Sequence, residues 1–279
     1  MARIDPVFIT RTIEATSFPS APNVVISFPH REDWWNRYPA LRRAGPRNQF
    51  EWLYQEQRRR YQDNMLKRLR NIQHCATGRA VLAELRARPS YSVCIFPWDF
   101  LPSIDWEYRD DLGLVDPLPI PQTRRERARG IKPPGTTKFP VRGMYSASLE
   151  KPGAVDVFYS DFRCEASDAD GVLLHELVHA LRVISGVFHQ SRMGGGYHDS
   201  EEFYANTIQM IYRSERGQVI HDYAYHPTNQ ASVLKQPKAR ALLTDLRHAQ
   251  PSLFLALARV DTPFNPIRPI ADQLLRIDL

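Results

Sequence analysis

The chain has 279 residues, of which 43% are hydrophobic and 24% are charged, and its formal net charge is +6. These values are typical of a globular protein that can bury a substantial core, and they exclude an intrinsically disordered chain. No run of 18 apolar residues is present, so the sequence predicts no membrane-spanning helix.

The mildly positive charge is concentrated in two arginine-rich stretches, residues 42–70 and residues 124–129. Such clusters can bind nucleic acid or an acidic partner. The sequence contains no RNA-binding aromatic motif and no zinc-finger pattern beside them. We therefore expect a solvated helix face and an exposed loop, and no nucleic-acid partner.

The cysteine count argues against a disulfide-bonded scaffold. Cys75, Cys94 and Cys164 are odd in number, widely spaced and without a C-x-x-C pattern. Reduced thiols in a cytosolic setting are the expected state. The first residues also lack the long apolar stretch of a conventional secretory signal.

The first third of the chain predicts strands and helices in alternation. Residues 1–45 look irregular, with one short strand at residues 24–28 between prolines. Helical spacing of apolar residues follows over residues 48–69, and a shorter helix is expected over residues 77–86. A strand at residues 91–97 ends at a proline.

Residues 115–139 are rich in proline and arginine and have little to bury, so they predict an exposed loop. This loop separates an N-terminal part, residues 1–114, from residues 140–279. We expect both parts to belong to one domain, residues 1–279. After the loop, residues 154–160 predict a strand that could flank the next helix and hold an extended peptide at its edge.

The stretch from Gly171 to Leu181 contains the pattern H-E-x-x-H, formed by His175, Glu176 and His179. Residues four apart share one face of a helix, so both imidazoles can bind one metal ion. A catalytic zinc ion takes three protein ligands and one water, whose pKa falls to about 7. Glu176 is close enough in sequence to take a proton from that water and return it to a leaving group.

The bare pattern also occurs by chance in amphipathic helices with surface histidines. Here leucine and valine surround the three polar residues, so the helix is apolar on nearly all sides and should be buried. Buried histidines and glutamate are costly unless they are paired or bind a metal. Asp168 or Asp170 can cap the start of this helix, and Gly186 can end it.

The third ligand must come from elsewhere in the chain. The extended pattern H-E-x-x-H-x-x-G-x-x-H fails, because Arg182 and Ser185 stand where Gly and His are required. His189 and His198 lie in a glycine-containing loop and could each reach the ion.

A carboxylate is the better candidate, at the start of a helix for which Ser200 is the expected N-cap. Glu202 is preferred over Glu201, because Ala205 and Asn206 extend its face of the helix. A small residue allows close approach, and an amide can hold a ligand histidine by its second nitrogen. Glu201 begins the opposite face and is expected to be only a helix-end charge.

The C-terminal third predicts supporting helices at residues 239–249 and residues 252–260. A proline-rich segment at residues 263–269 closes the chain.

An H-E-x-x-H followed by a helical glutamate is similar to the gluzincin class of zinc peptidases. The Glu-Phe-Tyr-Ala segment that begins at Glu202 resembles the corresponding helix of the anthrax lethal-factor protease domain. It also resembles metallopeptidase domains of bacterial effectors and toxins, and the match covers residues 170–216. The resemblance implies an α+β, mainly helical, zincin-like domain with a small mixed sheet flanking the H-E-x-x-H helix.

By this resemblance a tyrosine ahead of the third ligand would donate a hydrogen bond to the developing oxyanion. Tyr197 is the nearest equivalent, although its spacing to Glu202 is shorter than in lethal factor. The segment from His221 to His226 contains further tyrosine and histidine candidates.

We therefore expect a zinc-dependent endopeptidase in which His175, His179 and Glu202 bind zinc, and its partner is a protein substrate. A zinc hydrolase of a non-peptide amide or ester, or a non-catalytic metal-stabilised module, are the alternatives. The resemblance to effectors implies delivery into a target-cell cytosol without a signal peptide, with a secretion machine, chaperone or immunity protein as partners. A plain cytoplasmic peptidase fits equally well.

Overall fold

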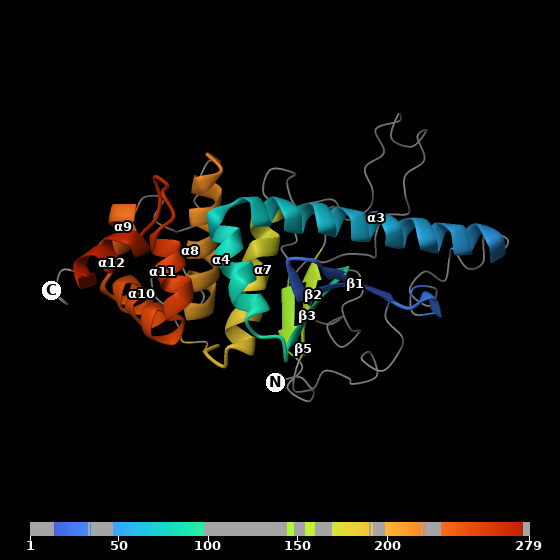
Figure 1. Cartoon of the computed structure of the whole chain (residues 1–279), viewed down its shortest axis with the longest axis horizontal. Coiled ribbons are helices and arrows are strands. Elements are labelled where there is room, and N and C mark those ends of the chain that lie inside the picture. Colours follow the sequence, from blue (N-terminus) through green and yellow to red (C-terminus); the bar gives the residue numbers. More distant parts are fainter. Residues whose placement is uncertain are drawn as a thin grey trace.

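The structure is a computed structural model that describes residues 14–32, 34, 47–97, 144–147, 154–159, 169–189, 191, 199–218, 220 and 230–275. A small sheet lies beside two central helices, α7 and α8, and further helices gather at the C-terminal end (Figure 1). The α+β class is therefore confirmed.

In the described part of the chain, the sheet has five strands in the order β1-β2-β3-β5-β4. The inner pairs β2–β3 and β3–β5 are parallel, whereas β1–β2 and β4–β5 are antiparallel. Strand β4 therefore forms one edge of the sheet, next to β5. The strands are β1 (Glu14–Phe18), β2 (Ala21–Phe28), β3 (Ser92–Pro97), β4 (Met144–Ala147) and β5 (Ala154–Tyr159).

One face of the sheet is apolar because the pairing register of neighbouring strands places aliphatic residues side by side. Val24 of β2 pairs with Val93 of β3, which pairs in turn with Val155 of β5. The next aligned row, two residues along each strand, is also made of buried aliphatic residues. Since side chains two apart point to the same face of a strand, these rows form a continuous part of the core.

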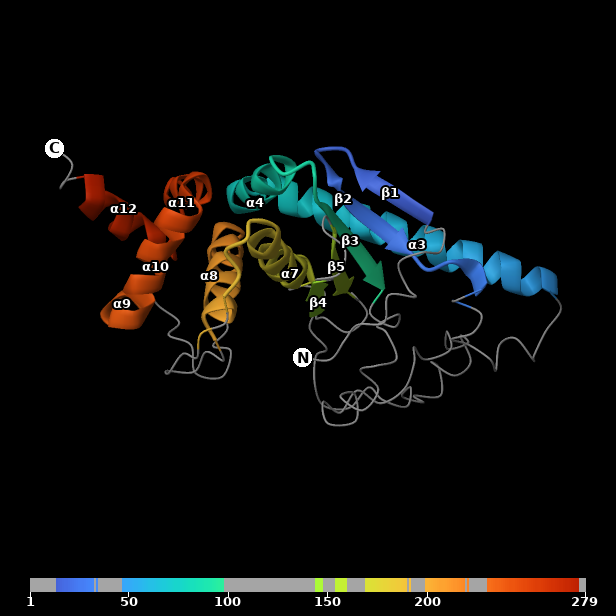
Figure 2. The ribbon, with the colours of Figure 1, turned by 90° about the horizontal axis from the view of Figure 1, so that it is seen from below.

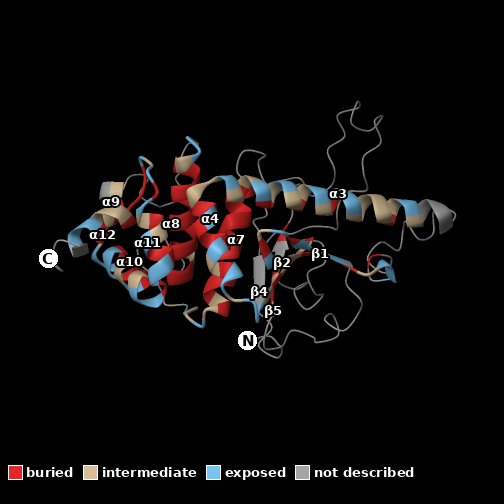
Figure 3. Ribbon diagram, in the orientation of Figure 1, coloured by how far each residue is buried: buried red, intermediate tan, exposed pale blue. Residues whose placement is uncertain are grey.

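Helices α3 (Arg47–His74) and α4 (Ala76–Arg86) contact β2, and α7 (Ala169–Ile184) contacts β5 and β4. Helix α8 (Ser200–Glu215) packs along α7, and Figure 3 shows that both are buried along most of their length. This burial explains why α7 has apolar residues on nearly all its sides.

Four shorter helices follow α8 and extend the helical part away from the sheet (Figure 2). Contacts of α11 with α4 and of α10 with α8 connect them to the rest of the fold. Among the described helices, none combines the length and the apolar character needed to cross a bilayer. They are α9 (Gln230–Lys235), α10 (Pro237–Ala249), α11 (Pro251–Ala258) and α12 (Ile267–Leu275).

Helix α8 also fixes the start of α4 through its last residue. The carboxylate of Glu215 accepts hydrogen bonds from the backbone N–H groups of Ala76 and Thr77 and from the Thr77 hydroxyl. A negative charge at a helix N-terminus satisfies free N–H groups and complements the helix dipole. The contact therefore supplies the cap that Cys75, at the N-cap position, does not provide through its side chain.

Most of the predicted elements are confirmed, with β2, α3, α4, β3, β5, α7, α8, α10 and α11 at or near their expected positions. Strand β1 was not expected, because the N-terminal residues looked irregular. Strand β4 and helices α9 and α12 were also missed, and α12 begins within the predicted proline-rich segment and includes its last three residues. The predicted loop at residues 115–139 lies outside the described residues.

We expect Gly78→Ala to destabilise the protein. A Cβ at Gly78 would overlap the carbonyl oxygen of Ile72, at the close approach of α4 to the end of α3. Alanine normally improves a helix by up to about 1 kcal/mol over glycine. Overpacking against backbone typically costs about 1–3 kcal/mol, so we expect a net loss in the free energy of unfolding, measured by urea denaturation.

The matched control is Arg86→Ala, an exposed substitution in the same helix, which we expect to change stability by less than about 0.5 kcal/mol. A Gly78→Ala protein as stable as the wild type would show that the two helices can separate without cost.

Candidate metal centre

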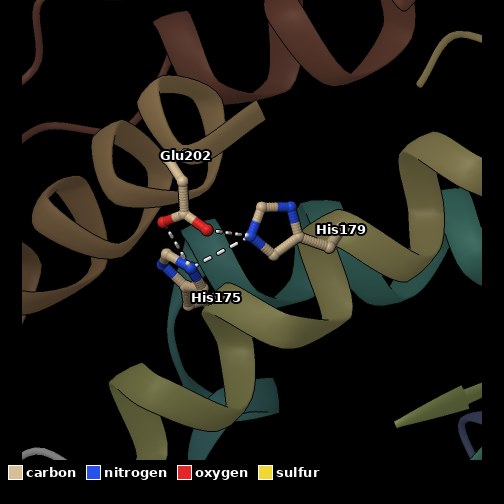
Figure 4. A group of neighbouring side chains, drawn as sticks. All are labelled: His175, His179 and Glu202. Atoms are coloured by element: carbon tan, nitrogen blue, oxygen red, sulfur yellow. Dashed lines mark hydrogen bonds and ion pairs between the residues drawn. The ribbon is translucent and has the colours of Figure 1, made fainter. Parts of the chain in front are cut away.

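Helix α7 presents His175 and His179 on the face that meets α8 (Figure 4). Their relative exposures are only 7% and 5%. The ring centroids are 4.7 Å apart, and the two Nε2 atoms are 3.1 Å apart. The helix ends as expected near Gly186, whose φ of 68° is readily adopted by glycine.

Glu202, in the first turn of α8, points its carboxylate at both imidazoles (Figure 4). One oxygen, Oε2, lies 3.4 Å from Nε2 of His175, and the other, Oε1, lies 3.3 Å from Nε2 of His179. The structure thus brings together the three residues that the sequence singled out as ligands.

The distances between these atoms fit a single bound metal ion. Ligand atoms about 2.0–2.1 Å from a tetrahedral zinc ion are separated from one another by about 3.3 Å. The observed separations of 3.1, 3.3 and 3.4 Å are close to that value, with each histidine next to a different oxygen of Glu202. Two imidazole nitrogens this close repel each other unless a proton or a metal cation lies between them. Histidine nitrogens and a carboxylate are a donor set that suits zinc.

Glu202 is held in its charged form. Burial alone would raise the pKa of its carboxyl group, but the contacts with His175 and His179 outweigh burial and hold the pKa well below its usual range. The group is therefore a carboxylate with its lone pairs available, as a metal ligand requires.

Two amide side chains of α8 support the ligands, in a different arrangement from the one predicted. Nδ2 of Asn206 donates to Oε2 of Glu202 at 3.4 Å, so Asn206 contacts the carboxylate and not a histidine. Oε1 of Gln209 lies 3.2 Å from Nδ1 of His175. The sequence signal for Gln209 was its position seven residues after Glu202, two helical turns along the same face.

The sequence predicted that Glu201 is only a charge at the end of a helix. The structure shows instead that Glu201 is buried and bonded to another helix. It is 1% exposed, and both its oxygens accept hydrogen bonds from Arg182 of α7, with the Nη2–Oε1 distance at 2.9 Å. Its Oε1 also accepts from the backbone N–H of His189. The guanidinium carbon of Arg182 lies 3.8 Å from the centroid of the Tyr204 ring, which adds a cation–π contact.

A second buried carboxylate joins the opposite ends of the same two helices. Asp170, predicted as a possible cap together with Asp168, lies inside the first turn of α7. Its oxygens accept from Arg68 and Asn71 of α3 and from Arg216, the residue that follows α8, at 2.8–3.0 Å. Helices α7 and α8 are therefore antiparallel and joined by a charged contact at each end. Asp168 lies outside the described residues.

The N-cap of α8 is Asp199, which corrects the prediction of Ser200. Oδ1 of Asp199 accepts from the backbone N–H groups of Glu201 and Glu202, at 2.9 and 3.0 Å. The Ser200 hydroxyl donates to the carbonyl of His189 and so holds the loop ahead of the helix. Aspartate is favoured over serine as the N-cap because its negative charge also interacts favourably with the positive end of the helix dipole.

Glu176 is 4% exposed in the middle of α7, one residue after His175. Burial of a carboxylate at this position is costly unless the group is paired or hydrogen-bonded. Beyond the histidines, the ring of Phe188 lies edge-on to His179, with the centroids 6.4 Å apart, so an aromatic residue flanks the centre.

The other site residues that the sequence predicted either lie outside the candidate metal-binding cluster or fall outside the described residues. The side chain of His189 is exposed, and it is not part of the cluster found among the described residues, which consists of His175, His179 and Glu202. Tyr197, His198 and the segment from His221 to His226 lie outside the described residues. Their predicted roles stay predictions.

Comparison with family models, with curated proteins and with solved structures found no match to this chain. The function must therefore be argued from the geometry of the centre itself.

We expect Arg182→Met to destabilise the protein strongly, because it leaves the Glu201 carboxylate buried without its partner. Removing one member of a buried ion pair typically costs about 3–5 kcal/mol. The free energy of unfolding of metal-free protein, from urea denaturation, measures the effect.

The double variant Arg182→Met, Glu201→Leu should recover much of the lost stability, since no unpaired charge remains. As a control, Arg59→Met removes the pairs of this exposed arginine with Glu56 and Asp63 and should cost less than about 1 kcal/mol. Equal effects of Arg182→Met and Arg59→Met would show that the buried pair has no special role.

Proposed function

We propose that this chain is a zinc-dependent endopeptidase of the gluzincin type. The observation that carries the proposal is the mutual spacing of 3.1–3.4 Å among the Nε2 atoms of His175 and His179 and the carboxylate oxygens of Glu202. These residues would hold the ion through two imidazoles and one carboxylate, the ligand set of the thermolysin-type centre.

When bound, zinc lowers the pKa of a coordinated water to about 7 and polarises a carbonyl group. Glu176 would take a proton from this water as its oxygen attacks the carbonyl carbon of the substrate. The carbon–nitrogen bond then breaks, and Glu176 returns the proton to the leaving amine. By the gluzincin resemblance, Tyr197 would donate to the oxygen of the attacked carbonyl.

The sheet edge supports a peptide as the substrate. Strand β4 ends the strand order, and in the described part of the chain no strand pairs with its outer side. Helix α7 contacts both β4 and β5, so this edge lies beside the helix that bears the histidines. An extended polypeptide can add to such an edge through backbone hydrogen bonds, while its scissile bond faces the metal centre.

The zincin-like fold and the biological role are parts of the same proposal. The mainly helical α+β architecture, with the sheet against α7, supports the former. The role as a bacterial effector or toxin, delivered into a target cell, rests on the sequence resemblance alone.

A non-peptide amide or ester is the alternative substrate, and a purely structural metal site is the alternative role. A structural zinc ion takes four protein ligands, whereas the cluster among the described residues has three. Three protein ligands would leave the fourth coordination position of the zinc ion open for water, so the ligand count favours a catalytic site over a structural one. Parallel assays on casein and on small amides and esters separate the two classes of substrate.

We expect Glu176→Gln to bind zinc as the wild type does and to lose nearly all proteolytic activity, because the amide cannot take a proton. Zinc content by atomic absorption and cleavage of casein are the two measurements. Asp261→Asn, the same chemical change at an exposed carboxylate, should leave both unchanged. Full activity in Glu176→Gln would exclude the proposed mechanism.

We expect Glu202→Ala to lose zinc, because it removes one of three ligands. His189→Ala should retain normal zinc content, since the His189 side chain is exposed and outside the cluster. Equilibrium dialysis against buffered zinc compares the two variants. Loss of zinc in His189→Ala would instead indicate a closed, four-ligand structural site.

A further inference from the structure

We propose that Gln209 is a positioning residue that fixes the tautomer and the ring orientation of His175 for metal binding. This inference rests on the proposed function, because it concerns a ligand of the same centre. The sequence predicted an amide that holds a ligand histidine by its second nitrogen, but it assigned that role to Asn206 and not to Gln209.

The contact between Gln209 and His175 joins an amide oxygen to a ring nitrogen. Gln209 is 3% exposed, and its Oε1 lies 3.2 Å from Nδ1 of His175. Because an amide oxygen only accepts hydrogen bonds, this contact is a hydrogen bond when Nδ1 of His175 carries the proton, and we infer that tautomer. In a neutral imidazole the lone pair is then on Nε2, the atom that faces Glu202 and His179.

The position of Gln209 is fixed by the rest of the helix pair. Arg182 binds Glu201 at one end of α7 and α8, and Arg216 binds Asp170 at the other. These contacts set the register of the two helices, so Gln209 faces His175 as a consequence of the fold. The amide is therefore in place before a metal ion binds.

The two amides of α8 divide the support between them. Asn206 donates through its nitrogen to the carboxylate of Glu202, and Gln209 accepts through its oxygen from His175. The amide nitrogen of Asn206 is a donor and contacts an anionic ligand, whereas the amide oxygen of Gln209 is an acceptor and contacts a protonated Nδ1. Each amide group is therefore matched to the ligand that it contacts. Exchanging these roles would leave Nε2 of His175 protonated and unable to bind a metal.

A buried glutamine could also be retained only because its own polar atoms need partners. Two substitutions separate these roles. Gln209→Met keeps a side chain of similar length but removes the acceptor, whereas Gln209→Glu keeps an acceptor oxygen. Loss of an outer hydrogen bond to a ligand typically weakens metal binding about 10–100-fold.

We therefore expect Gln209→Met to raise the zinc dissociation constant about 10–100-fold and Gln209→Glu to restore tight binding. Competition with a chromophoric chelator measures the constant, and urea denaturation of metal-free protein reports folding separately. Asn265→Leu is the control. Asn265 is also a buried and bonded amide, but its nitrogen donates to the backbone of Leu257 and Val260, so its loss should lower stability and leave zinc affinity close to that of the wild type.

An NMR measurement tests the tautomer directly. In metal-free wild-type protein, two-bond nitrogen–proton correlations should show His175 with its proton on Nδ1. In Gln209→Met the same ring should show a mixture of tautomers or the Nε2–H form.

Wild-type zinc affinity in Gln209→Met, or an unchanged tautomer, would overturn the positioning role and leave the proposed function standing. Weakened binding that Gln209→Glu does not restore, together with an equal loss in Asn265→Leu, would also overturn it in favour of general destabilisation. A wild-type protein that does not bind zinc would overturn both proposals.

Discussion

The buried contact between Arg182 and Glu201 is the constraint on which the metal centre depends. It joins the end of α7 to the first turn of α8, and both charged groups are almost completely buried. Because an unpaired charge in this position would be very costly, the two helices can meet only in the register that pairs them. That register places Glu202, the next residue along α8, opposite the histidines. A pairing at the surface would not have this effect, since water could solvate either partner.

The centre shows how a buried polar cluster can be compatible with an apolar helix. Helix α7 is surrounded by core residues, yet it carries His175, Glu176 and His179 in its middle. The Nε2 atoms of both imidazoles lie 3.3–3.4 Å from the carboxylate of Glu202, so the three polar groups are clustered together within the core. The amide of Gln209 satisfies the remaining nitrogen of His175. A metal ion would complete this arrangement by separating the two Nε2 atoms.

The elements missed in the sequence are those whose formation depends on a partner. Strand β1 has little alternation of apolar and polar residues, and it forms by pairing with β2 through a short turn. Strand β4 has four residues and is ordered along β5. Helix α12 begins before Pro269, and proline is tolerated there because the first turn of a helix needs no backbone donor. Long amphipathic or wholly apolar segments, such as α3 and α7, were predictable because their own pattern specifies how they are buried.

The sequence by itself determined the pair of histidines, the adjacent glutamate and the helix that carries them, because a spacing of four residues places both imidazoles on one helix face. It also favoured Glu202 over Glu201, through the small and amide residues along its face. Only the tertiary structure decided what Glu201, Asn206 and Gln209 contact. The partner side chains of Glu201 and Gln209 lie on another helix, and a sequence pattern specifies the faces of one helix but not the rotation and register of two. Those were decided by the buried charges at the ends of α7 and α8.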